Sequence, residues 1–207
     1  MDGDALDRLA ERARQRYALL LGGFRDALAR LSAEHPPGSE RARQALHAEL
    51  YRLASAWLEE EGGQVEAAVR AAGADGVAAT DAAIGVVAGA GEVSEAVAEH
   101  LGWLAGELDA QLRLQIERDV ALVMRGLRDM ALGDALRERL GRAPGGAAGR
   151  RGMGGSGARD DALSRVVFEF VDRSGRRWPS PKHVRALWRQ ALVLAWNEAA
   201  MLRMAEA

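Results

Sequence analysis

The sequence predicts a mainly α-helical protein with an elongated helical body, a glycine-rich linker and a small C-terminal β-hairpin–helix module. Over most of the body, apolar side chains recur at spacings of three and four, as they do on one face of a helix. Residues 141–157 contain eight glycines in 17 positions, which is typical of a linker. The apolar spacing then alternates as in a strand before it becomes helical again. We therefore predict a body over residues 1–140, a linker over 141–158 and a ββα module over 159–207.

The body opens with two predicted helices. The first spans residues 4–33 and ends before His35-Pro36-Pro37-Gly38, because proline cannot continue a helix. Ser39 is the predicted N-cap of the second helix, which runs to about residue 72 with Gly62-Gly63 as a candidate break. Together the two segments predict an antiparallel helical hairpin. The apolar face of the first helix consists of Leu6, Leu9, Ala13, Tyr17, Leu20, Phe24, Leu28 and Leu31.

A segment of small residues separates these helices from a third. Residues 73–91 are rich in glycine, alanine and valine, and a tightly packed helix, a loop and a mobile segment all stay open. The weakly charged run inside it has 16 residues and contains Asp81, so it is too short to span a membrane. A long helical pattern returns over residues 92–140, and its length suggests either an extended bundle or a break near Gly126 or Gly133.

The module after the glycines begins as a strand. Val166, Phe168 and Phe170 alternate with Val167, Glu169 and Val171. The four residues from Asp172 to Gly175 have Asp first and Gly last, as a type I turn prefers. A return strand around Trp178 is expected to end at Pro179. Ser180 is the predicted cap of a last helix of about 25 residues, with Pro181 at its first position.

The charge of the chain is unevenly distributed. Residues 141–190 hold 11 Lys and Arg against four Asp and Glu, a charge of +7, whereas the rest of the chain carries −9. A basic module can meet a polyanion or an acidic protein surface, or it can dock on the acidic body of its own chain. Both interpretations stay open, as does a purely solubilising role for the linker arginines. The candidate DNA or partner contacts are Arg150, Arg151, Arg159, Arg173, Arg177 and Arg185.

The sequence has no pattern that predicts catalysis. Cysteine is absent, which excludes disulfides, thiol nucleophiles and cysteine-ligated metals. The four histidines lie far apart, and a GxGxxG match at residues 152–157 lacks the preceding strand and following helix that a nucleotide site requires. We predict no catalytic residue, no metal and no cofactor. Trp57 and Trp103 are expected in the core; for Trp178, Trp188 and Trp196 a compact core is favoured over a stacking platform.

One segment resembles a known family. Asp172, Gly175, Arg176 and Trp178 are followed by Arg189, Ala195 and Asn197 within the last helix. These residues resemble the C-terminal signature of phage minor head proteins of the Mu F-like head-morphogenesis family, over about 30–40 residues. Two positions depart from that signature, because His183 stands where the family usually carries Tyr and Gln190 where it carries Thr.

The resemblance implies a structural virion component rather than an enzyme. Such a protein sits near the portal on the inner side of the head and takes part in head assembly and in DNA packaging or ejection. The implied partners are the portal, the major capsid protein, phage DNA without sequence preference, and further copies of the chain. It would be assembled in the host cytoplasm into the virion, with no membrane association. The alternatives are a helical adaptor unrelated to phage and a non-specific nucleic-acid-binding accessory protein.

The signature positions also have expected structural roles. Trp178 is expected to lie over the last helix and bury on the order of 150–250 Å². Arg176 or Arg189 is expected to pair with Asp172 or with a helix end. Asn197 is a poor helix former in mid-helix, so we expect its amide to bond the hairpin backbone.

Overall fold

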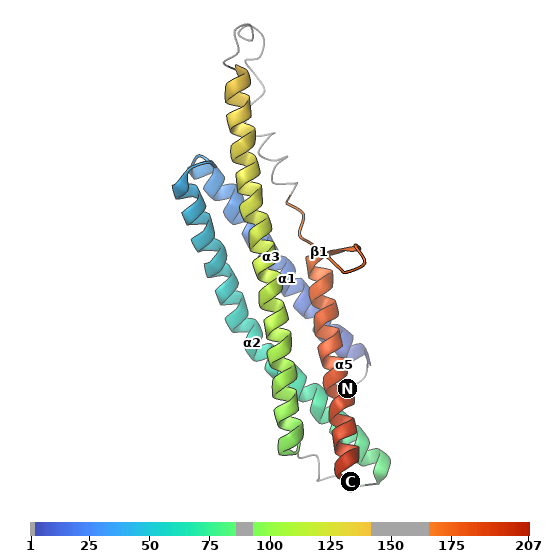
Figure 1. Cartoon of the computed structure of the whole chain (residues 1–207). Coiled ribbons are helices and arrows are strands. Elements are labelled where there is room, and N and C mark those ends of the chain that lie inside the picture. Colours follow the sequence, from blue (N-terminus) through green and yellow to red (C-terminus); the bar gives the residue numbers. More distant parts are fainter. Residues whose placement is uncertain (1–2, 86–92, 142–165) are drawn as a thin grey trace. The chain divides into compact units, whose positions relative to one another are not determined.

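The computed structural model describes residues 3–85, 93–141 and 166–207. Over these ranges the chain forms four helices and one two-stranded sheet, so the mainly α fold class and the hairpin before the last helix are confirmed (Figure 1). The helices are α1 (Gly3–Glu34), α2 (Glu40–Ile84), α3 (Glu95–Gly141) and α5 (Ser180–Glu206), and the strands are β1 (Glu169–Val171) and β2 (Arg177–Pro179). No described helix is both long and apolar enough to cross a lipid bilayer.

The chain folds into two compact units, and each unit takes segments from several helices. The first unit contains residues 1–18, 56–115 and 170–207. The second contains residues 19–55 and 116–169. The C-terminal hairpin and α5 therefore share a unit with parts of α1, α2 and α3. The predicted linker lies outside the described residues, except for Gly141.

The turn between α1 and α2 forms as the sequence predicts. The Ser39 side-chain oxygen accepts a hydrogen bond from the Ala42 N–H at 3.1 Å, so Ser39 caps the start of α2. Within the second unit the end of α1 and the start of α2 run antiparallel, and Arg30 reaches Glu49 at 3.4 Å between them. The predicted antiparallel hairpin is therefore present in this unit.

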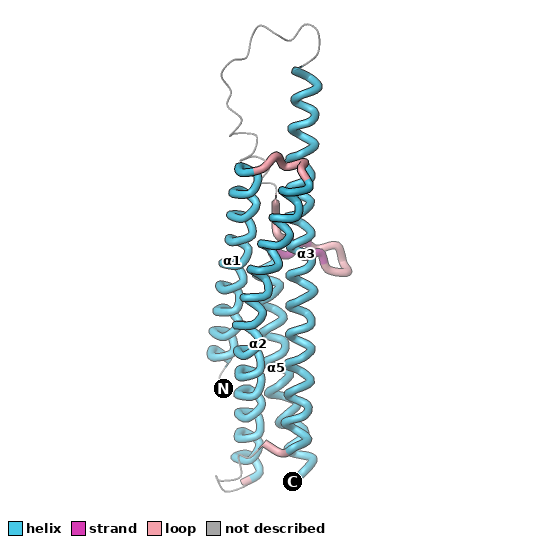
Figure 2. The backbone as a smooth tube through the Cα atoms, turned by 90° about the vertical axis from the view of Figure 1, so that its left-hand side faces the viewer, coloured by secondary structure: helices cyan, strands magenta, loops and turns pink. Residues whose placement is uncertain are grey.

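The glycines of α2 and α3 do not break these helices, so the possible break at Gly62-Gly63 is not found, and of the two alternatives for the third helix the break near Gly126 or Gly133 is not found. α2 runs for 45 residues through Gly62 and Gly63, and α3 runs for 47 residues through Gly126 and Gly133. The smooth tubes of Figure 2 show both helices as continuous. A glycine costs a helix about 1 kcal/mol relative to alanine, which is small beside the burial of a long apolar face.

The sequence left open whether residues 73–91 form a helix or a loop, and the structure answers this for the first part of the segment. Residues 73–84 belong to α2, so they form a packed helix; residues 86–92 are outside the described ranges. A Cβ built on Gly73 would lie 2.4 Å from Leu101 Cδ1, and one on Gly76 would lie 2.2 Å from the Trp196 carbonyl oxygen. These glycines let α2 approach α3 at Leu101 and α5 at Trp196 closely.

The tryptophans divide between core and surface. Trp57 is buried against Tyr17, with the ring centroids 5.3 Å apart and the rings nearly perpendicular. Trp188 is only 1% exposed, whereas Trp178 is half-buried. The prediction of Trp103 in the core is wrong, since this side chain is 61% exposed and stacks beside His100.

The segment before the hairpin keeps the predicted alternation but little of the predicted strand. Val166 and Phe168 are buried and Val167 is exposed, although β1 begins only at Glu169. In the second unit, Arg25 places its guanidinium 4.9 Å from the Phe168 ring centroid. A Cβ on Gly126 would lie 2.7 Å from Val166 Cγ2, so this glycine makes room for the segment against α3.

Candidate functional site

The hairpin turn is built by Asp172 and Gly175, as predicted. The Gly175 N–H donates to the Asp172 carbonyl at 2.9 Å, and the Asp172 N–H donates to the Arg176 carbonyl at 3.0 Å. Gly175 has a φ of +80°, which L side chains rarely adopt. A type I turn followed by a left-handed residue is a common three-residue hairpin loop. The spacing from Asp172 to Arg176 is thus explained by backbone geometry.

The Asp172 carboxylate holds the loop together. Its Oδ1 accepts hydrogen bonds from the Ser174 hydroxyl at 2.6 Å and from the backbone N–H groups of Ser174 and Arg176, both at 2.9 Å. Its Oδ2 accepts the Trp178 indole N–H at 3.1 Å. These bonds, first from the Ser174 hydroxyl and then from Trp178, lower the pKa of Asp172 to about 2. The carboxylate is therefore ionised at neutral pH and fixes the direction of the indole.

The expected ion pairs of Asp172 with arginine are not found among the described residues. Arg176 places its guanidinium 5.9 Å from the Trp178 ring centroid, while its backbone N–H binds Asp172. Arg189 instead pairs with Asp7, at 2.9 Å from Nε to Oδ1. Arg176 therefore contributes to the loop through its backbone N–H, which binds Asp172, and through its guanidinium, which lies over the Trp178 ring.

Asn197 does not have the role predicted for it. It is exposed in the middle of α5 and makes no hydrogen bond with the described hairpin. At 1.5 Å per residue it lies about 25 Å along the helix from Ser180, which is beyond the reach of a side chain. Ala195 is fully buried on the core face of α5. The signature residues therefore separate into one loop and three independent positions on α5.

The start of α5 differs slightly from the predicted one. Ser180 is the first residue of the helix and Pro179 occupies the N-cap position, one residue earlier than expected. The Ser180 hydroxyl is buried and accepts a hydrogen bond from the Gln115 amide at 3.2 Å. One turn later the His183 ring stacks flat on Phe170, with centroids 3.8 Å apart. These contacts connect α5 with α3 and with the hairpin in the first unit.

Basic residues of α5 meet acidic residues of α1. Arg185 lies 3.3 Å from Glu11 and 3.7 Å from Asp7, and Arg189 shares Asp7. Arg203 pairs with Asp81 of α2 at 2.7 Å near the other end of the helix. For these three arginines the structure favours docking on the acidic part of the chain. Asp7 and Glu11 were not predicted as contacts, although their spacing of four on a predicted helix is the signal of a common face.

A pocket of about 480 Å³ lies where these elements meet. Trp178 forms one wall, Lys182, Arg185 and Arg189 project from one face of α5, and Arg14 comes from α1. Its other lining residues are Glu11 and Ala186. Four cations thus surround one carboxylate and one aromatic ring. Lys182 and Arg14 were not among the predicted contact residues, and only the fold brings them to Trp178.

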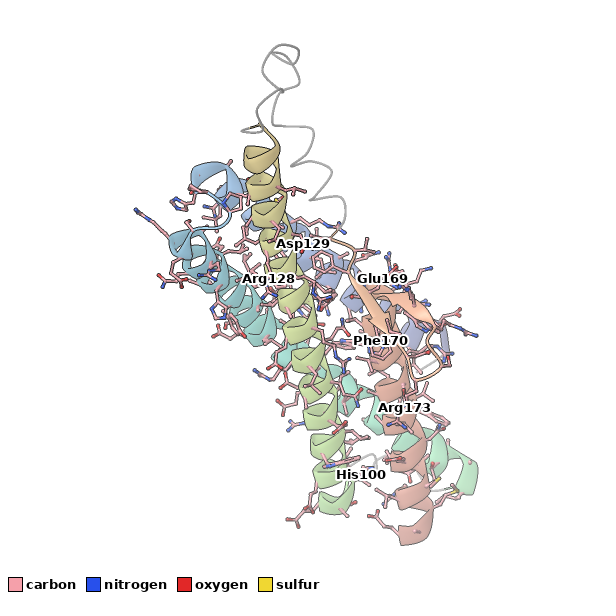
Figure 3. The ribbon with its side chains drawn as sticks, turned by 45° about the horizontal axis from the view of Figure 1, so that its top comes forward. His100, Arg128, Asp129, Glu169, Phe170 and Arg173 are labelled. Carbon is pink, nitrogen blue, oxygen red and sulfur yellow. The ribbon has the colours of Figure 1, made fainter. Side chains whose placement is uncertain are left out.

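The predicted contact residues are distributed around this pocket as far as the structure describes them. Arg185 lines it, and Arg173 and Arg177 are exposed on the adjoining hairpin. Figure 3 shows Phe170 and Arg173 at the hairpin beside the first turns of α5. The predictions for Arg150, Arg151 and Arg159 fall outside the described residues.

Two further polar clusters lie elsewhere in the first unit. Arg16 binds Glu61 through two hydrogen bonds of 2.8 Å, with Glu61 almost fully buried. His100 Nε2 and a Glu198 carboxylate oxygen lie within hydrogen-bonding distance of each other between α3 and α5. Over the described ranges, no three side chains of His, Cys, Asp or Glu gather in a geometry that would hold a metal ion.

Comparison with known proteins assigns no family to the chain. A scan of protein-family models and searches of curated proteins and of solved structures found no match.

Proposed function

We propose that this protein is a structural component of a phage head, a minor head protein that binds near the portal on the inner side of the head. The observation that carries the proposal is the local structure of the signature. Asp172, Gly175, Arg176 and Trp178 form one hydrogen-bonded loop that leads directly into α5. Asp172 accepts the hydrogen bonds of the loop, Gly175 adopts its positive φ, and Arg176 and Trp178 donate to Asp172. These are structural roles, as expected of a scaffold motif. The proposed partners are the portal and the major capsid protein, with further copies of the chain.

The helical architecture supports a role in assembly. Long helices expose large apolar side chains at scattered positions, among them Leu19, Leu132 and Met201. Arg173 and Arg177 are exposed on the hairpin, where an acidic protein surface can meet them. A chain that contributes surfaces rather than reactive groups fits a virion component.

Incorporation into heads tests the proposal. Heads are purified on a density gradient from cells that produce the full, tagged chain together with portal and major capsid proteins. We expect the chain to co-sediment with heads in few copies and to cross-link to the portal. Recovery only in the soluble fraction, bound to proteins unrelated to heads, would instead support the alternative of a helical adaptor unrelated to phage.

A matched pair of variants links incorporation to the signature loop. Asp172→Ala removes the carboxylate that accepts four hydrogen bonds, whereas Asp129→Ala removes an exposed carboxylate on α3. We expect the first variant to lose incorporation while its helical circular dichroism is retained, and the second to be incorporated normally. Equal incorporation of both variants would count against the signature loop as the docking element.

A further inference from the structure

We infer that the pocket beside Trp178 binds a nucleotide unit of single-stranded nucleic acid, with its base on the indole ring and its phosphate on the surrounding cations. The pocket lies within the first compact unit, between the start of α5 and the first half of α1. The inference stands on this pocket alone and does not depend on a role in phage heads.

Trp178 offers a fixed aromatic surface to the pocket. Its indole N–H is held by Asp172 at 3.1 Å, and the Arg176 guanidinium lies 5.9 Å from the ring centroid. The side chain is half-buried, so part of it is held by the protein while another part lines the pocket. A ring whose orientation is already fixed loses little conformational entropy when a base stacks on it.

The cations of the pocket are placed for a phosphate group. Lys182, Arg185 and Arg189 share one face of α5, and Arg14 reaches in from α1. Lys182 is exposed and has no ion pair with the described carboxylates. These four cations carry a charge of +4, and Asp7 and Glu11, which pair with the arginines, carry −2. The net charge of the cluster is therefore +2.

The existing ion pairs leave room for a ligand. The side chains of Arg185, Asp7 and Glu11 are each about 40% exposed, and ion pairs of such exposure contribute little to stability. A guanidinium carries five donors, so an incoming phosphate can share Arg185 and Arg189 with the carboxylates. The pocket volume of about 480 Å³ also lies within the range of small-molecule sites.

The combination of ring and cations favours a nucleotide over an acidic peptide. An acidic peptide uses the cations alone, whereas a nucleotide uses both the cations and the oriented ring. A base in a duplex is stacked inside the helix and cannot reach Trp178, but an unpaired base can. Arg173 and Arg177 extend the positive surface along the hairpin, which favours a strand over a free mononucleotide.

The experiment measures fluorescence anisotropy of a labelled oligothymidine of about 12 nucleotides with the full chain, at about 50 mM salt. Parallel samples contain the same length of duplex, thymidine monophosphate as competitor, and a polyglutamate peptide as competitor. Trp178→Leu removes the ring, Trp178→Phe keeps an aromatic face and Lys182→Gln removes one exposed cation. The matched controls are Trp103→Leu, an exposed tryptophan elsewhere in the first unit, and Arg70→Gln, an exposed cation on α2.

We expect Trp178→Leu to weaken binding about 5- to 150-fold, the range that stacking of one base supports. Trp178→Phe keeps an aromatic face but loses the N–H bond to Asp172, so it should bind more tightly than Trp178→Leu and less tightly than the unchanged protein. Lys182→Gln should lower the slope of binding against salt by about one. The control variants should bind as the unchanged protein does. Thymidine monophosphate should compete only weakly; competition as strong as by the unlabelled strand would identify a free nucleotide as the ligand of the same pocket.

Several results would overturn the inference. These are no binding of the oligonucleotide at low salt, equal binding of duplex and single strand, or unchanged affinity of Trp178→Leu with intact circular dichroism. Equal loss of affinity in both Trp178 variants, with no effect of Lys182→Gln, would also contradict it, because an aromatic face would then make no difference. If the oligonucleotide does not bind, a labelled polyglutamate peptide is titrated in its place, and its binding would make the pocket a protein-docking site. None of these results affects incorporation into heads, which is measured separately.

Discussion

At the hairpin turn, Asp172 accepts three hydrogen bonds on Oδ1 and one on Oδ2. All four donors favour the ionised carboxylate, and this lowers its pKa to about 2. Protonation would remove the charge that attracts these donors and convert one acceptor oxygen into a donor. The order of the loop, and with it the orientation of Trp178, is therefore linked to the ionisation of this one side chain.

The loop should accordingly resist acid down to an unusually low pH. Because the pKa of Asp172 is lower in the folded loop than its ordinary value of 3.8, its contribution is complete above that value and is lost as the pH falls through about 2. The measurement is the NMR resonance of the Trp178 indole N–H, assigned by its absence in Trp178→Phe. We expect a midpoint near 2 and no such titration in Asp172→Asn. A midpoint near 4 would contradict the proposed hydrogen bonding.

Trp188 of α5 and Trp178 of β2 should differ in their contribution to the free energy of unfolding. Trp188 is 1% exposed and lies under the Arg16 guanidinium, whereas Trp178 is half-buried. Trp188→Ala should lower the free energy of unfolding by about 3–5 kcal/mol, and Trp178→Ala by less. Urea denaturation followed by circular dichroism compares the two variants. If Trp178→Ala proves the more damaging, the hairpin and not the helix face is the main packing element of this unit.

At the scale of elements, α2 and α5 are held in close contact by small residues and polar groups. A Cβ on Gly76 would meet the Trp196 carbonyl oxygen at 2.2 Å. The Thr80 hydroxyl lies 3.0 Å from the Gly76 carbonyl and 3.4 Å from that of Ala200. Because the obstacle at Gly76 is backbone rather than a flexible side chain, the two helices would have to separate to admit a methyl group.

The same substitution should have opposite effects at two glycines of α2. Gly76→Ala should destabilise the protein because the methyl group separates α2 from α5, despite the better helix propensity of alanine. Gly63→Ala should stabilise it by up to about 1 kcal/mol, because nothing lies within 4 Å of a Cβ there. Thermal or urea unfolding of both variants provides the measurement. Stabilisation by both substitutions would show that α2 and α5 are not in close contact in solution.

At the scale of the whole molecule, the compact units are not continuous stretches of the sequence. The first compact unit draws residues 1–18, 56–115 and 170–207 from distant parts of the chain. Its segments are connected by ion pairs such as Arg189 with Asp7 and Arg203 with Asp81. The C-terminal segment is therefore part of a core shared with α1, α2 and α3 rather than a module that packs only on itself.

Limited proteolysis tests this arrangement. The glycine content of residues 141–157 predicts that trypsin cuts first at Arg142, Arg150 or Arg151. We expect the fragment with α5 to co-elute with the remainder in native gel filtration and to separate from it in urea. Early cleavage inside the long helices would place the boundary elsewhere. Separation of the fragments without denaturant would support an independent module.

The sequence by itself determined the features that depend on near neighbours. Ser39 and the prolines before it mark the turn between α1 and α2, because a cap and a missing N–H act within one helical turn. The hairpin loop follows from Asp172 and Gly175 in the same way, since a side-chain acceptor and a left-handed residue are both local requirements. Helical periodicity was enough for the fold class.

Only the tertiary structure decided what depends on distant segments. Propensity treats Gly62, Gly73 and Gly126 alike as weak points of a helix, whereas their effect depends on what approaches them. Periodicity likewise could not separate the exposed Trp103 from the buried Trp188, because a helix does not specify which neighbour covers each face. The pocket beside Trp178 requires Arg14 and Arg189, which lie far apart in the chain and meet only when α1 and α5 pack. Long-range packing of apolar faces, which local pattern does not encode, therefore places the candidate site.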